Sequence, residues 1–146
     1  MSTLAQTRGD ATVRTIASGI LTGQSQEVGA MRGWLRLWHQ PAVDAHPMSW
    51  MSTMHGHGMA GMSNATMPGM AEPTQLTRLA QLHGASFDRL FLQLMIRHHR
   101  GGVSMAADAR RHAGLKVVRE AAATMIVEQV EEMGAMQALL AAHPEE

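Results

Sequence analysis

The sequence predicts an all-α protein, folded as an antiparallel helical bundle. Residues 10–38, 86–112 and 115–142 carry apolar side chains at steps of three and four, which is the spacing of one helical face. Between the first of these stretches and the others lies a segment rich in methionine and histidine, with neither a helical nor a strand period. The two ends of the chain also resemble each other, which is typical of a bundle built from repeated helices.

Length and composition narrow the classes of function. The 146 residues, 45% of them hydrophobic, suffice for one small domain with a core, and methionine must fill part of that core because aromatic residues are scarce. The formal net charge is zero and no basic block occurs, so we expect no nucleic-acid partner. The absence of cysteine excludes disulfides and thiolate metal sites and suits an oxidising compartment. We also expect no transmembrane segment, and the first residues show no signal peptide.

The first predicted helix, residues 10–38, belongs to an internal repeat. Shifted by 105 positions, residues 9–35 match residues 114–140 at ten of 27 positions without a gap, including Gln24 with Gln129 and Glu27 with Glu132. The same shift places the counterpart of the histidine-bearing helix described below before Met1. We therefore interpret residues 1–39 as a partial first repeat that contributes one long helix.

A partial repeat has a consequence for assembly. The helix keeps an apolar stripe, and burying each such side chain is worth roughly 1.5–3 kcal/mol. One chain offers three main helices where two complete repeats would offer four, so part of the stripe stays open. We predict a homodimer or larger assembly at micromolar concentration, with Trp34 and Trp38 near the contact. A longer native form would add the upstream helix and an export signal.

Residues 40–73 are predicted to be a flexible, disordered linker, because proline, glycine and serine interrupt them and they bury too little to fold alone. Seven methionines within 23 residues are more than a solvated linker needs. Thioethers suit Cu(I) and imidazoles suit Cu(II), so the linker is predicted to bind additional, weaker copper. Its candidate ligands are Met48, Met51, Met54, His55, His57, Met59, Met62, Met67 and Met70.

Residues 74–146 form the complete second repeat. Helices are predicted at about 74–83, 86–112 and 115–142. Pro73 with Thr74 suits a helix start, Ser86 suits another, and Gly114 lies where a glycine that ends a helix is expected.

The main candidate site lies on the helix 86–112. Met95, His98, His99 and Met105 fall within about a third of its circumference, so thioether and imidazole groups project side by side. Without thiols or a dense carboxylate cluster, this set favours copper over calcium, magnesium or di-iron. The alternative is an ordinary core, because methionine commonly fills helical interiors and buried histidine usually lacks a metal. Gly101 and Gly102 cost on the order of 1 kcal/mol each inside a helix, which indicates a close approach, open space or a helix break there.

The last helix carries a matching face formed by Met125, Gln129, Glu132 and Met136, with Met133 just beside it. If the two helices pair antiparallel, Gln129 and Glu132 can hydrogen-bond the imidazole N–H groups and fix their orientation. Met133 and Met136 are then further metal ligands. The alternative is that the methionines belong to the core and Glu132 is solvated.

These residues resemble a known family. Asp88, Phe91, Met95, His98 with His99, Gly102 and Met105 with Ala106, followed by Gln129, Glu132 and Met136, are similar to the pattern of the domain of unknown function 305 family, over about residues 75–143. The resemblance implies a ferritin-like fold and copper binding in a periplasmic or other extracytoplasmic compartment.

Two classes of function remain open at this point. The first is a copper-binding protein for storage, transfer or resistance, which implies a copper-transfer protein as partner and no enzymatic activity. The second is a ferritin-like oxidase, which the sequence disfavours because no Glu has a His three residues further on, as di-iron bundles require. A metal-free, methionine-rich interaction module is the third interpretation.

Overall fold

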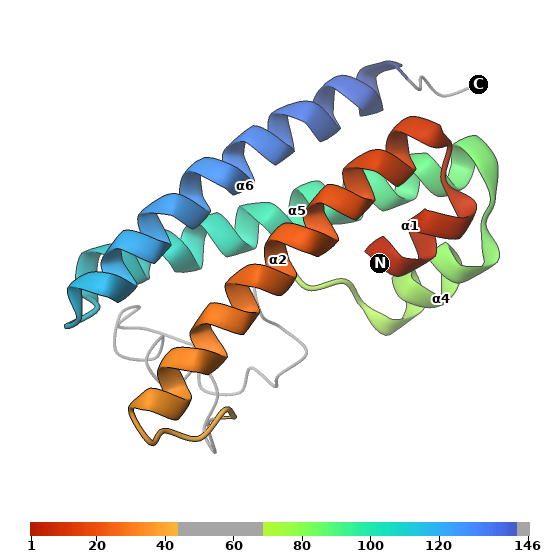
Figure 1. Ribbon diagram of the computed structural model, residues 1–146. Helices are drawn as coiled ribbons and strands as arrows, with labels where there is room; N and C mark the ends of the chain where they lie inside the picture. The colour runs from red at the N-terminus through yellow and green to blue at the C-terminus, as the bar shows by residue number, and fades with distance from the viewer. Residues whose placement is uncertain (44–68, 143–146) are drawn as a thin grey trace, which may run out of the picture.

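The computed structural model describes residues 1–43 and 69–142, and the predicted all-α bundle is confirmed (Figure 1). Its helices are α1 (Ser2–Arg8), α2 (Ala11–Leu37), α4 (Pro73–Gln81), α5 (Gly84–His112) and α6 (Lys116–Ala142), and the described residues contain no strand. Helices α5 and α6 form a long antiparallel pair. Helix α2 crosses this pair, while α1 and α4 pack beside the first half of α5.

The core lies where the first halves of α2 and α5 meet. Phe87 and Phe91 stack one turn apart on α5 with ring centroids 6.1 Å apart, and both are fully buried. Val13, Ala17 and Ile20 of α2 are buried in the same cluster. Methionine fills part of this core, because Met95 and Met136 are members of the cluster.

The start of α2 is tied to α5 by two aspartates. The carboxylate of Asp10 accepts a hydrogen bond of 2.7 Å from the Val13 amide, which caps the helix. The amide of Asp10 donates to Oδ1 of Asp88, a buried residue of α5, at 3.2 Å. Gly9 allows this approach, since a Cβ there would come within 3.2 Å of the same Asp88 oxygen and within 2.9 Å of Val13.

Most predicted helix ends agree with the structure within one or two residues, but two capping assignments are wrong. Helix α5 begins at Gly84 after His83, so Ser86 lies inside it rather than at its N-terminus. It ends at His112, the following Ala113 has an extended backbone, and Gly114 is not a left-handed cap. Arg119 takes over this role by donating to the carbonyls of Ala113 and Gly114 at 2.7 and 2.9 Å.

The two stretches that the sequence comparison aligns form helices of equal length. Helices α2 and α6 each contain 27 residues, and both their first and their last residues lie 105 positions apart. Arg14 donates to the carbonyl of Gly9 at 2.9 Å, the counterpart of the Arg119 bond to Gly114. The sequence did not predict helix α1. The same shift of 105 residues aligns it with the last turns of α5.

The linker prediction concerns mainly residues 44–68, which lie outside the described residues. Its last residues belong to the folded part. Glu72 and Gln75 form a reciprocal capping box, and α4 begins at Pro73. Helix α4 therefore begins one residue before the position predicted for it.

Candidate functional site

The candidate site lies on the seam between α5 and α6, where facing residues define the antiparallel register. His99 of α5 faces Glu132 of α6, and one turn further along Gly102 faces Gln129. A Cβ on Gly102 would overlap the carboxamide oxygen of Gln129, so this glycine provides the close approach that the sequence indicated. The same register places Met95 opposite Met136, and both belong to the buried core cluster.

His99 is almost fully buried, with 1% of its surface exposed, and both of its ring nitrogens have partners. Nδ1 lies 2.9 Å from the carbonyl oxygen of Met95, which can only accept, so Nδ1 carries a hydrogen. Nε2 lies 2.6 Å from Oε2 of Glu132. The second contact therefore contains one further proton, held either by the ring or by the carboxyl group.

The predicted sulfur ligands are divided along the seam. Met95, one turn before His99 on α5, and Met136, one turn after Glu132 on α6, are buried. Met133 is partly buried against the same core. Met105 is half-buried beyond Gly102, where it lines a groove shared with α2. Met95 and Met136 therefore lie one turn from the His99–Glu132 contact along their helices, whereas Met105 lies further toward the end of α5.

His98 has a different environment from His99. The two rings lie edge to face with centroids 6.0 Å apart, and His98 is half-buried against the backbone of Gly69. Gly69 has a φ of 84°, and a Cβ there would collide with the backbone of Arg97 and His98. Burial, followed by the neighbouring His99, lowers the pKa of His98. The end of the methionine-rich segment therefore rests directly on the His98 turn.

Arg97 strengthens this attachment. Its guanidinium donates to the side-chain oxygen of Gln75 at 2.5 Å and to the carbonyl of Met70 at 3.5 Å. Met70 is 45% exposed and is the only linker candidate among the described residues. The other candidates lie outside the described residues: Met48, Met51, Met54, His55, His57, Met59, Met62 and Met67.

Gln129 does not hydrogen-bond either imidazole among the described residues. Its carboxamide oxygen is buried against Gly102 without a hydrogen-bond partner there. Glu132 alone therefore makes the bond to an imidazole that was predicted for both residues.

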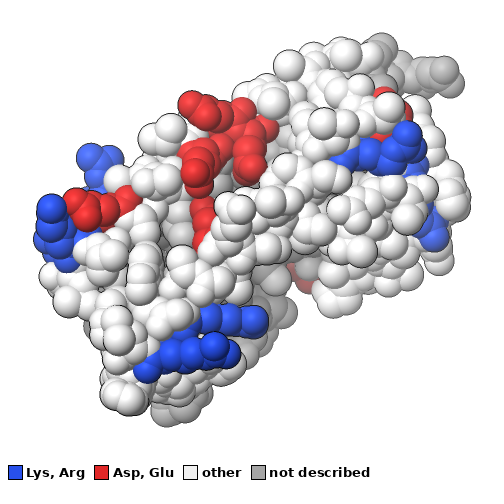
Figure 2. Space-filling model, viewed as in Figure 1, with Lys and Arg blue, Asp and Glu red and all other residues white. Residues whose placement is uncertain are grey.

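Glu27 is not among the site residues predicted from the sequence, although it aligns with Glu132 in the repeat. Glu27 lines a groove of about 590 Å³ between α2 and α6, together with Glu128, Glu131 and Glu132. Figure 2 shows acidic side chains gathered where these two helices face each other. Burial, then the charges of Glu128 and Glu132, raise the pKa of Glu27, while His99 opposes the shift.

The donor groups do not form a ready-made site for a hard cation. Among residues 1–43 and 69–142, no three His, Asp or Glu side chains converge closely enough to hold a metal ion. What the α5–α6 seam offers instead is one buried imidazole bound to a carboxylate, with Met95 one turn before His99 on α5 and Met136 one turn after Glu132 on α6.

Comparison with known proteins supports the resemblance seen in the sequence. The family model named DUF305, a domain of unknown function, matches residues 1–140. A crystal structure from Streptomyces coelicolor, of a DUF305 protein whose name calls it secreted, is similar with a TM-score of 0.84 and 35% identity. The alignment covers 97% of this chain and 82% of that one. A DUF305 fragment from Deinococcus radiodurans has a TM-score of 0.77 and 26% identity, over 97% and 83% of the two chains. Among curated proteins, none matches.

Proposed function

Because the chain belongs to the DUF305 family, whose function is unknown, we propose a function from its own residues: it binds copper through thioether and imidazole groups. Copper is the cargo, held for storage, transfer or resistance, and no catalytic role is proposed. Cu(I) is favoured because thioethers are soft ligands, and imidazole allows Cu(II) as well.

The observation that carries this proposal is the position of two buried methionines, Met95 and Met136, one turn from the His99–Glu132 contact along α5 and α6. Both side chains are buried in the hydrophobic core cluster, and Met133 packs against that cluster. The Nδ1–H of His99 is held by the Met95 carbonyl, which leaves Nε2 as the nitrogen able to ligate a metal. Thioether and imidazole together are the donor set that suits copper.

The hydrogen bond of Glu132 sets the condition for binding. Copper at Nε2 requires that the proton between His99 and Glu132 leave, because a ligating imidazole nitrogen must be free of hydrogen. The Glu132 carboxylate, which no longer shares a proton with His99, can then serve as a further copper ligand. Gln129, whose buried oxygen has no partner among the described residues, is the next polar group along the seam.

We propose that additional copper ions bind outside the His99 site, with His98, Met105 and the linker residues as ligands. His98 faces the end of the methionine-rich segment through Gly69, so the proposal places a weaker site there, with thioethers from the linker. Ordering that segment around a metal costs about 1–2 kcal/mol per residue fixed, which is the reason for the lower affinity.

We place the function outside the cytoplasm, in the periplasm or an equivalent compartment. The absence of cysteine suits an oxidising environment, and the similar Streptomyces protein is named as secreted. None of the described helices is long and apolar enough to cross a membrane. The proposal includes a ferritin-like relationship of the bundle, a copper-transfer protein as partner and a homodimer.

An anaerobic Cu(I) competition titration of the purified protein tests the proposal. Met95→Leu with Met136→Leu conserves core volume and removes two sulfurs, so it should lower the affinity of the tightest site while circular dichroism stays helical. His112→Ala, at an exposed histidine near the end of α5, is the matched control and should leave that affinity unchanged. Replacing Met54, Met59 and Met62 by leucine should reduce only the number of weaker sites.

The same titration distinguishes the alternatives. If no copper binds, the metal-free interaction module is the better interpretation. If copper binds equally well after both leucine substitutions and after His99→Ala, the site on the α5–α6 seam is rejected.

A further inference from the structure

Two grooves along α2 adjoin each other. One is the groove of about 590 Å³ between α2 and α6 that contains the four glutamates, which we call the acidic groove. The other has a volume of about 620 Å³, is bordered by α5 as well, and is called the apolar groove. Their common wall consists of Glu27, Met31 and Trp34 of α2, and Ala121, Met125 and Gln129 of α6. A molecule lying along this wall would therefore meet carboxylates at one end and an apolar surface at the other.

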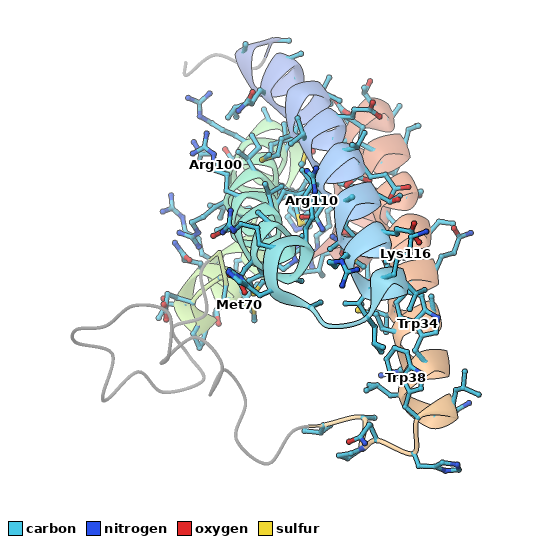
Figure 3. The ribbon with its side chains drawn as sticks, turned by 90° about the vertical axis from the view of Figure 1, so that its left-hand side faces the viewer. Trp34, Trp38, Met70, Arg100, Arg110 and Lys116 are labelled. Atoms are coloured by element: carbon cyan, nitrogen blue, oxygen red, sulfur yellow. The ribbon has the colours of Figure 1, made fainter. Side chains whose placement is uncertain are left out.

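The apolar groove has the size and lining of a small-molecule site. Trp34 and Trp38 stack along it with ring centroids 6.2 Å apart, and Figure 3 shows them following each other along α2. Methionines from all three long helices and alanines of α5 and α6 also line it. Asp108 and His112, two further lining residues, are bonded to each other at 2.9 Å. Small-molecule sites typically have volumes of roughly 300–1,000 Å³ and mostly apolar walls.

The acidic groove contains negative charge that the protein does not balance. Glu132 is paired with His99, but Glu27, Glu128 and Glu131 form no ion pair within residues 1–43 and 69–142. Nor do His, Asp or Glu side chains of these residues converge in groups that could hold a metal ion. Negative charge spread over a groove matches a bulky organic cation better than a small metal ion.

We propose that the two grooves together bind a small organic cation, in which an ammonium group is joined to an apolar chain or ring. The ammonium group lies in the acidic groove, where Glu27 and Glu128 attract it. Trp34 lies on the common wall, and the face of an indole ring also attracts organic cations. The apolar part of the molecule extends into the apolar groove, between the tryptophans of α2 and the α5–α6 pair. The inference does not depend on copper binding.

Calorimetric titration of the unmodified, metal-free protein with octyltrimethylammonium tests the proposal. We expect saturable binding below about 1 mM, a concentration at which the probe forms no micelles. Tetramethylammonium has the same charge without the chain, and octanoate has an apolar chain with a negative charge. Each of these two compounds lacks one half of the match, so each should bind at least about tenfold more weakly.

Substitutions at the two ends of the site should have different effects. Glu27→Gln should weaken the binding of octyltrimethylammonium about tenfold, because the partner of the ammonium group loses its charge. Trp34→Leu should weaken the binding of octyltrimethylammonium by a similar factor. Glu120→Gln is the matched control, since it removes the same charge from α6 at a glutamate that lines neither groove, and it should leave the affinity unchanged. Circular dichroism checks that the variants remain helical.

Three results would overturn the proposal. The first is no binding of octyltrimethylammonium up to about 1 mM. If an amphipathic peptide of leucine and lysine nevertheless binds, the grooves are a docking surface for a basic helix instead. The second is equal affinity for octyltrimethylammonium and octanoate, which would show that the carboxylates do not select the ligand. The third is an equal loss of affinity in Glu27→Gln and Glu120→Gln, which would show only a general effect of net charge.

Discussion

His99 and Glu132 are joined across α5 and α6 by a contact of 2.6 Å that contains a proton, while the other ring nitrogen of His99 is bonded to the Met95 carbonyl. With both nitrogens engaged and 1% of its surface exposed, His99 has no contact with water to replace a lost partner. The pair therefore fixes the register of α5 against α6 as well as the orientation of the candidate ligand.

Removing the Glu132 carboxylate should show how much the stability of the protein depends on the His99–Glu132 contact. Glu132→Ala leaves a polar nitrogen of the buried imidazole without a partner, and we expect it to reduce the free energy of unfolding by about 2 to 3 kcal/mol. Glu131→Ala, at the exposed neighbouring glutamate, should change it by no more than about 0.5 kcal/mol. Urea denaturation of both variants at neutral pH provides the comparison. Equal losses would show that the His99–Glu132 contact contributes nothing specific.

Gly102 should respond to alanine differently from a glycine in open space. Gly134 of α6 has nothing within 4 Å of a built Cβ, so Gly134→Ala should stabilise the protein by about 0.5–1 kcal/mol through helix propensity. At Gly102 the new methyl group must displace the Gln129 carboxamide, so most of that gain should be lost. In a Gln129→Ala background the gain should return. Additive effects of the two substitutions would contradict the close contact.

Much of the fold could be predicted because local rules agreed with one another. The apolar period of α2 runs from Val13 to Trp38, and Asp10 before it is a strong N-cap, so both ends of this helix were assigned to within one residue. The helix predicted at 115–142 likewise agrees with α6 to within one residue at its start and matches it at its end. The glycines at 101 and 102 broke the pattern of a stable helix, and Gly102 proved to make room for Gln129.

Other features depend on contacts between distant segments, which the periodicity of one helix cannot express. His98 was assigned to the same stripe as His99, but Gly69 approaches its side of α5 and separates the two environments. The sequence predicts that Gly114 caps the end of α5. In the structure, Arg119 from the next helix donates to the carbonyls of Ala113 and Gly114 instead. Glu27 could not be predicted as a site residue, because the groove that it lines is formed only when α2 and α6 come together.

The environment of His98 predicts a stability that depends on pH. Its pKa is lower in the folded protein than its ordinary value of 6.5, so the unfolded chain binds more protons just below that value. Folding stability should therefore rise as the pH increases through this window and fall on acidification. His98→Gln should flatten this part of the profile, measured by urea denaturation of the metal-free protein between about pH 5 and about pH 8. An unchanged profile would mean that His98 is solvated in the same way in both states.

Glu27 predicts the opposite slope. Its pKa is raised above the ordinary carboxyl value of 4.5, so the folded protein holds this proton more tightly than the unfolded chain does. Its contribution to stability is then largest at low pH and declines as the pH rises through the window from 4.5 to the raised value. Burial and the negative charges of Glu128 and Glu132 make the ionised form of Glu27 unfavourable, and Glu27→Gln removes that negative charge. At neutral pH it should therefore stabilise the protein, by about 0.5 kcal/mol because the site is partly solvated. If Glu27→Gln instead destabilises the protein at neutral pH, the carboxylate has a favourable partner there, and the groove between α2 and α6 must be regarded as a site that attracts positive charge.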